Sequence, residues 1–252
     1  MKLGLVTYNM AKDWDVPTII ENCVETGFSG VELRTTHAHG VEIDLSASER
    51  AAVKQQFADS PIEIAGLGSA YDYHATDQAV VRRNIAGTKA YSQLAADVGA
   101  PGVKVRPNGL PNEVPVEKTL EQIGLALREC GEFAADLGVE IRLEVHGGGT
   151  SELPHIRTII DVADHDNVYV CWNSNFGEVE DGSILNNFNY ARGRIGLVHI
   201  TELHRREYPW RELFTLLKAS GYSGYTLAEI AGSSDPIRVM SFYRALWEEL
   251  SR

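Results

Sequence analysis

Eight short β-rich runs recur along the chain, each followed by a stretch with helical periodicity. The runs begin about 27 to 40 residues apart, which is the length of one strand, one helix and two short loops. Strands that alternate with helices pair in parallel through crossover helices, and eight such units close into a barrel. The sequence therefore predicts an α/β protein with a single (β/α)₈ barrel, a TIM barrel, over residues 1–252. The predicted strands are Leu3–Tyr8, Gly30–Arg34, Ile62–Leu67, Gly102–Arg106, Val139–His146, Val168–Asn173, Ile195–Ile200 and Gly224–Ile230.

Apolar residues at steps of three and four mark the helices between these runs. The segment from Val116 to Leu137 carries one such stripe, and Gly138 after it is typical of a helix C-terminus. Ser234-Asp235-Pro236 is a helix start signal, because a capping residue precedes a first-turn proline. No linker, low-complexity run or second domain interrupts the series.

Charged and apolar residues alternate within several predicted strands. In residues 139–146, for example, Ile141 and Leu143 alternate with Arg142 and Glu144. Because helices cover the outside of a barrel, the apolar set should face them and the charged set should project inward. Buried charges are costly unless they are paired or bind a metal. An internal ion-pair network is therefore one interpretation of the deeper charges, which are Glu32, Arg34, Lys104, Arg106, Glu140 and Arg142.

Four polar residues, Glu144, Asn173, His199 and Glu229, lie near the ends of the last four predicted strands. Consecutive members are 29, 26 and 30 residues apart, one strand–helix unit each time, which predicts equivalent heights on neighbouring strands. Barrels of this type place their chemistry at the carboxyl ends of the strands. Two carboxylates, an imidazole and an amide oxygen suit a divalent ion such as Mn²⁺, Mg²⁺ or Co²⁺, with Zn²⁺ as a further candidate. We therefore predict that these four residues bind a divalent metal ion.

Other polar residues are expected at the same rim of the barrel. His146 shares the inward face of its strand and precedes three glycines that would let a ligand approach closely. Lys104 and Arg106 also point inward, where they could bind a carboxylate or phosphate or pair with Glu32. His37 follows the second predicted strand in a loop. These four residues, the two histidines, Lys104 and Arg106, are candidate substrate-binding residues.

Five segments then carry a resemblance to a known family. They are, in chain order, GFSGVELR, VEIRLEVHG, VYVCWNSN, IGLVHITELHR and YTLAEI. As an ordered set they resemble the xylose isomerase-like barrel superfamily, over nearly the whole chain. That superfamily includes sugar and sugar-phosphate isomerases and epimerases, inosose dehydratases and type IV apurinic endonucleases.

The ketose 3-epimerase branch supplies the most detailed match. It holds a metal with Glu, Asp, His and Glu at the ends of strands five to eight, which correspond here to Glu144, Asn173, His199 and Glu229. That branch also has a His–x–x–Glu–x–x–Arg run, found here from His199 to Arg205. The resemblance implies that Arg205 contacts substrate oxygens.

Two positions depart from that pattern. Asn173 stands where the branch has Asp, and an amide oxygen coordinates a metal without contributing charge. Phe176 stands where the branch has a histidine, and Asn175 is the residue that would replace it in part. Both departures imply a weaker metal site.

We interpret the chain as a divalent-metal-dependent isomerase or epimerase of a sugar or related polyol. Glu144 and Glu229 would act as acid and base, one removing a proton from carbon to give an enediolate at the metal and the other returning it. Two alternatives stay open: an inosose-type dehydratase on the same site, and a non-catalytic sugar-binding barrel with a weakened metal site. The endonuclease branch needs several metals and many more ligands than the eight histidines here supply.

Charge and cysteine content bound the partners. A formal charge of -12, from 35 acidic and 23 basic residues, disfavours nucleic acid. The three cysteines are far apart and typical of buried thiols in a reducing compartment. No run approaches the roughly 20 apolar residues of a membrane span, and the start is too short and polar for a secretory signal. We therefore expect a cytoplasmic protein with a small-molecule sugar or polyol substrate and no nucleic-acid or membrane partner; the resemblance allows a homo-oligomer.

Overall fold

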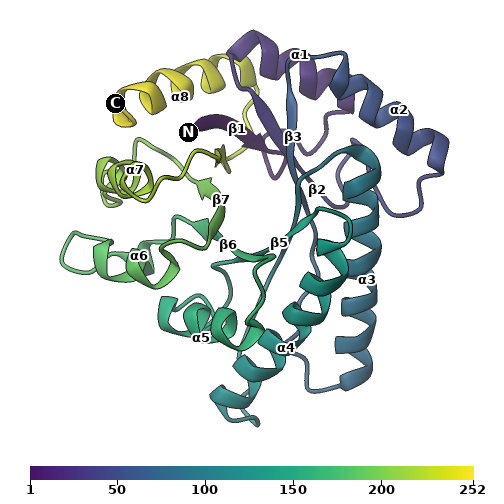
Figure 1. Cartoon of the computed structure of the whole chain (residues 1–252). Coiled ribbons are helices and arrows are strands. Elements are labelled where there is room, and N and C mark those ends of the chain that lie inside the picture. The colour runs from purple at the N-terminus through teal and green to yellow at the C-terminus, as the bar shows by residue number, and fades with distance from the viewer.

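Eight parallel strands form a closed barrel in the computed structural model, which describes residues 1–252. The strands follow one another around the barrel in chain order, and β1 pairs with β8 to close it (Figure 1). The predicted (β/α)₈ barrel is confirmed. The strands are β1 Lys2–Val6, β2 Gly30–Arg34, β3 Glu63–Gly68, β4 Gly102–Val105, β5 Glu140–Glu144, β6 Val168–Asn173, β7 Ile195–Ile200 and β8 Tyr225–Ala228.

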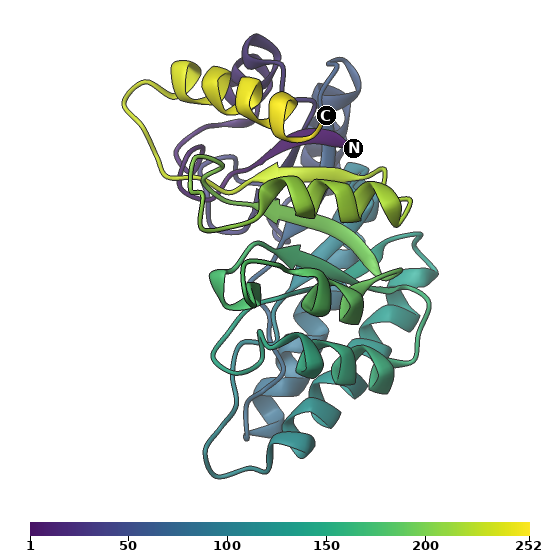
Figure 2. The same cartoon turned by 90° about the vertical axis from the view of Figure 1, so that its left-hand side faces the viewer.

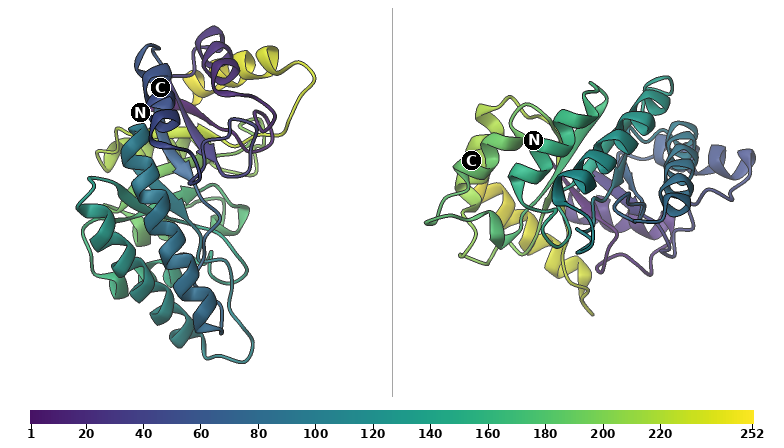
Figure 3. Two further views of the ribbon diagram at one scale, coloured as in Figure 1. Left: turned by 90° about the vertical axis from the view of Figure 1, so that its right-hand side faces the viewer. Right: turned by 90° about the horizontal axis from the view of Figure 1, so that it is seen from below.

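A ring of eight helices surrounds the strands. Seen from the side, the helices run along the outside of the barrel, and α3, α4 and α5 lie next to one another on one flank (Figures 2 and 3). The helices are α1 Val16–Thr26, α2 Ala47–Ala58, α3 Gln78–Val98, α4 Val116–Ala135, α5 Leu153–Ala163, α6 Leu185–Ala191, α7 Trp210–Ala219 and α8 Pro236–Leu250, with a short 3₁₀ turn at Phe176–Glu178. None of these helices combines the length and the apolar character that crossing a membrane requires.

Local signals place the helix ends where the sequence predicts them. The side chain of Asp235 accepts a hydrogen bond from the backbone N–H of Arg238, and Pro236 opens α8. After α4, Gly138 adopts a φ of 67°, a left-handed conformation that glycine adopts without a steric penalty. The chain can therefore turn directly from α4 into β5.

The core has two layers. The outer layer packs strands against helices and includes Ile141, Leu143 and Trp172, all fully buried. The inner layer fills the barrel itself with a small apolar cluster made of Val6, Ala65, Cys171, Leu197, Tyr225 and Leu227. All three cysteines are buried and free, in agreement with the sequence.

Charged side chains lie inside the barrel beside this apolar cluster. Glu32, Lys104 and Arg142 are each at most 5% exposed, so the inward alternation predicted from the sequence is present. Arg142 pairs with Glu140 at 2.7 Å, one of the internal ion pairs expected. Gly68 leaves room for Glu32, because a Cβ there would lie 2.7 Å from Glu32 Oε1.

Candidate metal centre and substrate cavity

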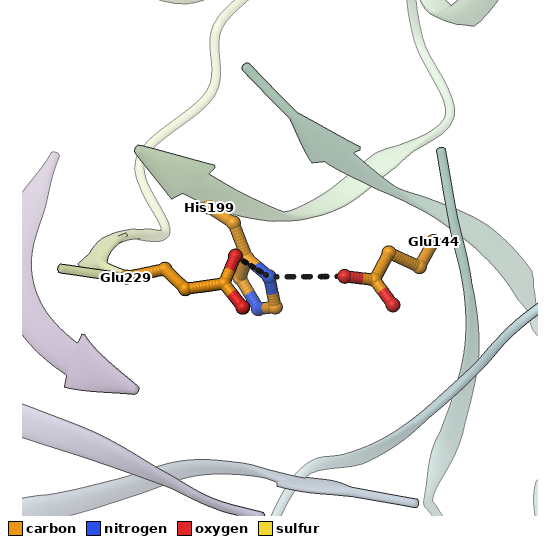
Figure 4. Close-up of side chains that lie close together, drawn as sticks. All are labelled: Glu144, His199 and Glu229. Atoms are coloured by element: carbon orange, nitrogen blue, oxygen red, sulfur yellow. Dashed lines mark ion pairs between the residues drawn. The ribbon is translucent and has the colours of Figure 1, made fainter. Parts of the chain in front are cut away.

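Three possible metal ligands converge at the carboxyl ends of β5, β7 and β8. His199 Nδ1 lies 3.5 Å from Glu144 Oε1 and 3.6 Å from Glu229 Oε2. One ligand atom from each residue falls within 4.8 Å of the other two. Figure 4 shows the imidazole between the two carboxylates, which approach it from different sides. The structure thus brings three of the four predicted ligands to one point.

Strand register shows how these residues meet. Glu144 pairs with Cys171, two residues before Asn173, and His199 pairs with Leu227, two residues before Glu229. Asn173 pairs directly with His199, so these two are level as predicted, whereas Glu144 and Glu229 are each offset by two residues from the neighbouring member of the set. Strands of a closed barrel are tilted and staggered, so residues at different register positions still converge at one rim.

His199 is oriented as a metal-binding histidine would be. Its Nε2 lies 3.3 Å from Glu32 Oε2, while its Nδ1 is buried without a hydrogen-bond partner. Metal-ligating histidines typically place their second nitrogen against a carboxylate in this way, which fixes the ring. A buried imidazole nitrogen that faces two carboxylate oxygens fits a divalent cation.

The charges of the cluster also fit a cation. Burial lowers the pKa of His199, but the neighbouring carboxylates of Glu32 and Glu144 raise it, so the pKa lies above its ordinary value. With His199 protonated, three carboxylates, from Glu32, Glu144 and Glu229, face two cations, His199 and Lys104. A divalent ion that replaces the His199 proton would bring these charges into balance.

Lys104 forms an ion pair with one of the two carboxylate oxygens of Glu144. Its Nζ lies 2.8 Å from Glu144 Oε2, and both side chains are at least 94% buried. The sequence left pairing of Lys104 with Glu32 as an alternative, but the ion pair is formed with Glu144 instead. Burial lowers the pKa of Lys104, but the carboxylates of Glu144 and Glu32 raise it by more. The pKa is therefore above its ordinary value, and the side chain stays charged. Lys104 therefore leaves Glu144 Oε1 directed at His199.

Asn173 lies beside the same oxygen. Its Nδ2 is 3.4 Å from Glu144 Oε1, so the amide donates toward the carboxylate in this conformation. Coordination through Oδ1 requires the amide to turn about its Cβ–Cγ bond. Asn173 is therefore adjacent to the cluster, and its role as a fourth ligand stays a prediction.

Asn173→Asp is expected to tighten binding of Mn²⁺ by roughly tenfold or more, because a charged oxygen ligand binds a hard cation more strongly than an amide. The same change should lower the thermal midpoint of the metal-free protein, since it adds a buried carboxylate beside Glu144. Calorimetric titration and thermal melts would measure both effects. Asn189→Asp on the exposed face of α6 is the matched control, and an unchanged metal affinity in Asn173→Asp would place the residue beyond reach of the ion.

A cavity of about 410 Å³ opens above the cluster. Its polar lining includes Lys104, Arg106 and His146, three of the five substrate-binding candidates. The sequence placed Arg34 only in an ion-pair network and did not predict a cavity role for Asn9 or Thr201. The full lining is Tyr8, Asn9, Arg34, Lys104, Arg106, Glu144, His146, Asn173, Asn175, Thr201 and Glu229.

Two candidate residues lie outside this lining. His37 Nδ1 is 2.8 Å from the Thr7 hydroxyl, and its ring stacks on Tyr8, so it supports the cavity wall from behind. Arg205 is exposed and its guanidinium lies 4.6 Å from the centre of the Phe176 ring. A direct contact of either residue with substrate remains a prediction.

The glycine loop after β5 serves chain packing. Gly147 has a φ of 92°, and a Cβ there would lie 2.6 Å from the backbone of Asn108. Gly147 thus permits a close approach of the loop after β4, whereas nothing lies within 4 Å of a Cβ built at Gly148, and the approach of a ligand to this loop stays a prediction. Burial lowers the pKa of the preceding His146, which keeps this cavity-lining imidazole neutral.

A buried glutamate after β6 went unnoticed in the sequence. Glu178 is 2% exposed, and its carboxyl accepts hydrogen bonds from the Tyr208 hydroxyl at 2.8 Å and the Asn175 amide at 3.2 Å. Trp172 Nε1 donates to the same Tyr208 hydroxyl. Burial raises the pKa of Glu178 to about 8. Because Asn175 lines the cavity, this network fixes one of its walls.

Comparisons with known proteins agree with the fold. Residues 20–246 match the model of the xylose isomerase-like TIM barrel family, which confirms the resemblance. A curated L-ribulose 3-epimerase from Mesorhizobium japonicum is 24% identical over 246 residues, covering 92% of this chain and 80% of that protein. A solved L-ribulose 3-epimerase superposes with a TM-score of 0.83 at 19% identity, covering 100% of this chain and 95% of that one. A structure of the IolI protein with a bound zinc atom gives a TM-score of 0.78 at 19% identity, covering 100% and 96%.

Proposed function

Because the chain belongs to the xylose isomerase-like TIM barrel family, we propose that it is a divalent-metal-dependent isomerase or epimerase of a sugar or related polyol. The observation that carries this proposal is the convergence of Glu144, His199 and Glu229 at the floor of a polar cavity. A relative that is an L-ribulose 3-epimerase and a structural neighbour with zinc support the same class of chemistry.

Glu144, His199 and Glu229 would hold the ion, with Asn173 as a fourth ligand. When bound, the ion would polarise a carbonyl group and its neighbouring hydroxyl. Zn²⁺, Mn²⁺, Mg²⁺ and Co²⁺ all accept this mixture of oxygen and nitrogen ligands.

Glu144 and Glu229 would also move the proton. One carboxylate removes the proton from the carbon beside the carbonyl, which leaves an enediolate, and the other carboxyl returns a proton to the opposite face. The two side chains reach His199 Nδ1 from different strands, β5 and the end of β8, so they would approach a bound substrate from two directions (Figure 4). The neutral His146 in the cavity lining would hold a substrate hydroxyl.

Metal content measured by mass spectrometry tests the proposal first. We expect about one Mn, Co, Mg or Zn per purified chain, lost in a Glu144→Gln/Glu229→Gln double variant. A panel of ketoses in D₂O should then show deuterium incorporation at the carbon beside the carbonyl with the wild type alone. No turnover of ketoses or inososes with any of the four metals would count against the isomerase.

Asn173 keeps one other function open, a sugar-binding barrel without catalysis. Its neutral amide supplies less charge than a carboxylate would at this position. A chain that binds sugar tightly, resists added metal and gains metal only as Asn173→Asp would be a binding protein.

A further inference from the structure

We infer that the substrate carries an anionic group, a carboxylate or a phosphate, which binds Arg34 and Arg106 across the cavity from the metal cluster. The inference rests on the proposed function, since it names the substrate class of the same site. The named relatives act on L-ribulose, a sugar without such a group.

The acidic and the basic side chains that line the cavity come from different strands. Its carboxylates, Glu144 and Glu229, come from β5 and from the end of β8. Its guanidiniums come from the other half of the barrel, since Arg34 ends β2 and Arg106 follows β4. A ligand in the cavity would therefore meet carboxylates from one half of the barrel and arginines from the other half.

A glycine stands on β3, the strand between the two that lead to the arginines. In the barrel register, Arg34 pairs with Gly68 of β3, and Gly68 pairs with Lys104 of β4. The middle member of this row has no side chain. Glu32 takes up the space beside this glycine, since a Cβ at Gly68 would lie 2.7 Å from Glu32 Oε1, while Arg34 and Arg106 themselves line the cavity.

Neither guanidinium has a carboxylate partner. Arg34 donates only to the Thr35 carbonyl, at 3.3 Å, and lies 5.0 Å from the centre of the Tyr8 ring. Arg106 donates to the Ala70 carbonyl, at 3.0 Å, and its Nε is buried without a partner. Arginines elsewhere in this acidic chain do form ion pairs, such as Arg50 with Asp97 at 2.8 Å.

Unneutralised guanidiniums in a partly desolvated cavity favour an anion. The planar fork of arginine matches the two oxygens of a carboxylate or phosphate, and charge-assisted bonds of this kind are stronger than bonds between neutral groups. Hydroxyl recognition alone does not require two full positive charges. The arginines therefore select a sugar with an acidic group at the end remote from the reacting carbons.

Three six-carbon ketoses that differ only at the last carbon provide the test: D-fructose, D-fructuronate and D-fructose 6-phosphate. Their dissociation constants would be measured by calorimetry with the full chain, both Mn²⁺-loaded and metal-free. We expect at least one anion to bind roughly tenfold or more tightly than D-fructose, with the preferred one identifying carboxylate or phosphate.

Arg34→Gln/Arg106→Gln should abolish this preference, so that the three ketoses bind alike, because an amide retains neutral hydrogen bonding without the charge. Arg82→Gln, an exposed position on α3, is the matched control and should keep the preference. Thermal melts would verify that the variants fold.

Equal binding of D-fructose and both anions would overturn the inference, as would a preference that survives in the double variant or failure of all three ketoses to bind. Anion preference without turnover would leave the inference standing and count against the isomerase. Turnover of D-fructose with no anion preference would support the isomerase and overturn the inference of an anionic substrate.

Discussion

Glu229→Gln is expected to lower epimerisation by about 10²- to 10⁴-fold, because it removes one of the two groups that move the proton. Glu229 is the better position to change, since Glu144 is also bonded to Lys104 and its substitution would disturb that buried pair. The side chain of Glu229 is 20% exposed, and glutamine keeps its size and an oxygen for the ion.

A two-carboxylate mechanism predicts an asymmetric defect. In Glu229→Gln, Glu144 can still remove and return a proton on its own face. One of the two epimers should therefore exchange its proton with D₂O without inversion, while the other shows neither exchange nor inversion. Proton NMR of each pure epimer in D₂O would follow both processes.

Glu63→Gln is the control for this experiment. Glu63 opens β3, and its side chain is 59% exposed and paired with Lys2. The Glu63→Gln variant should exchange the proton of both epimers with D₂O, and should invert both epimers, as the wild type does. Equal residual exchange of both epimers in Glu229→Gln would exclude Glu229 as the acid–base group for one face.

The barrel could be predicted because its signals are local and repeated. Strand length, helix stripes and capping residues such as Asp235 depend on neighbours in sequence, and eight repeats together identify one architecture. The spacing of Glu144, His199 and Glu229 depends on the same repeat, so it predicted their convergence as well.

Side-chain partners could not be predicted, because they depend on the stagger between strands. Alternation placed Lys104 inside the barrel, but only the register brings it to Glu144 and leaves Glu32 to His199. Arg205 followed a family motif, yet the loop after β7 sets its guanidinium on Phe176. Loop conformation of this kind has no periodic signal in the sequence.

The burial of Glu178 could not be predicted from the sequence either. As a single acidic residue in a polar loop, it gives no sign of burial in the sequence. In the fold it lies beneath Asn175 and Tyr208, where burial raises its pKa to about 8. A carboxyl in an unfolded chain has a pKa near 4.3.

The sign of the pH effect follows from these two values. Between about pH 4.3 and pH 8, folded Glu178 keeps a proton that the unfolded chain has lost, so raising the pH favours unfolding. Below this window both states are protonated, and above it both are ionised and the loss is complete. The free energy of unfolding should therefore fall by up to about 1.4 kcal/mol per pH unit within the window.

Glu178→Gln should remove this contribution, because the amide does not titrate. Relative to wild type, the variant should gain about 3–4 kcal/mol of unfolding free energy between pH 5 and pH 8. Urea denaturation of the metal-free proteins at several pH values measures the difference. Glu180→Gln, exposed in the same loop, should follow the wild-type curve. Parallel curves for wild type and Glu178→Gln would mean that Glu178 titrates alike in the folded and unfolded chains, and that its burial is offset by the bonds from Tyr208 and Asn175.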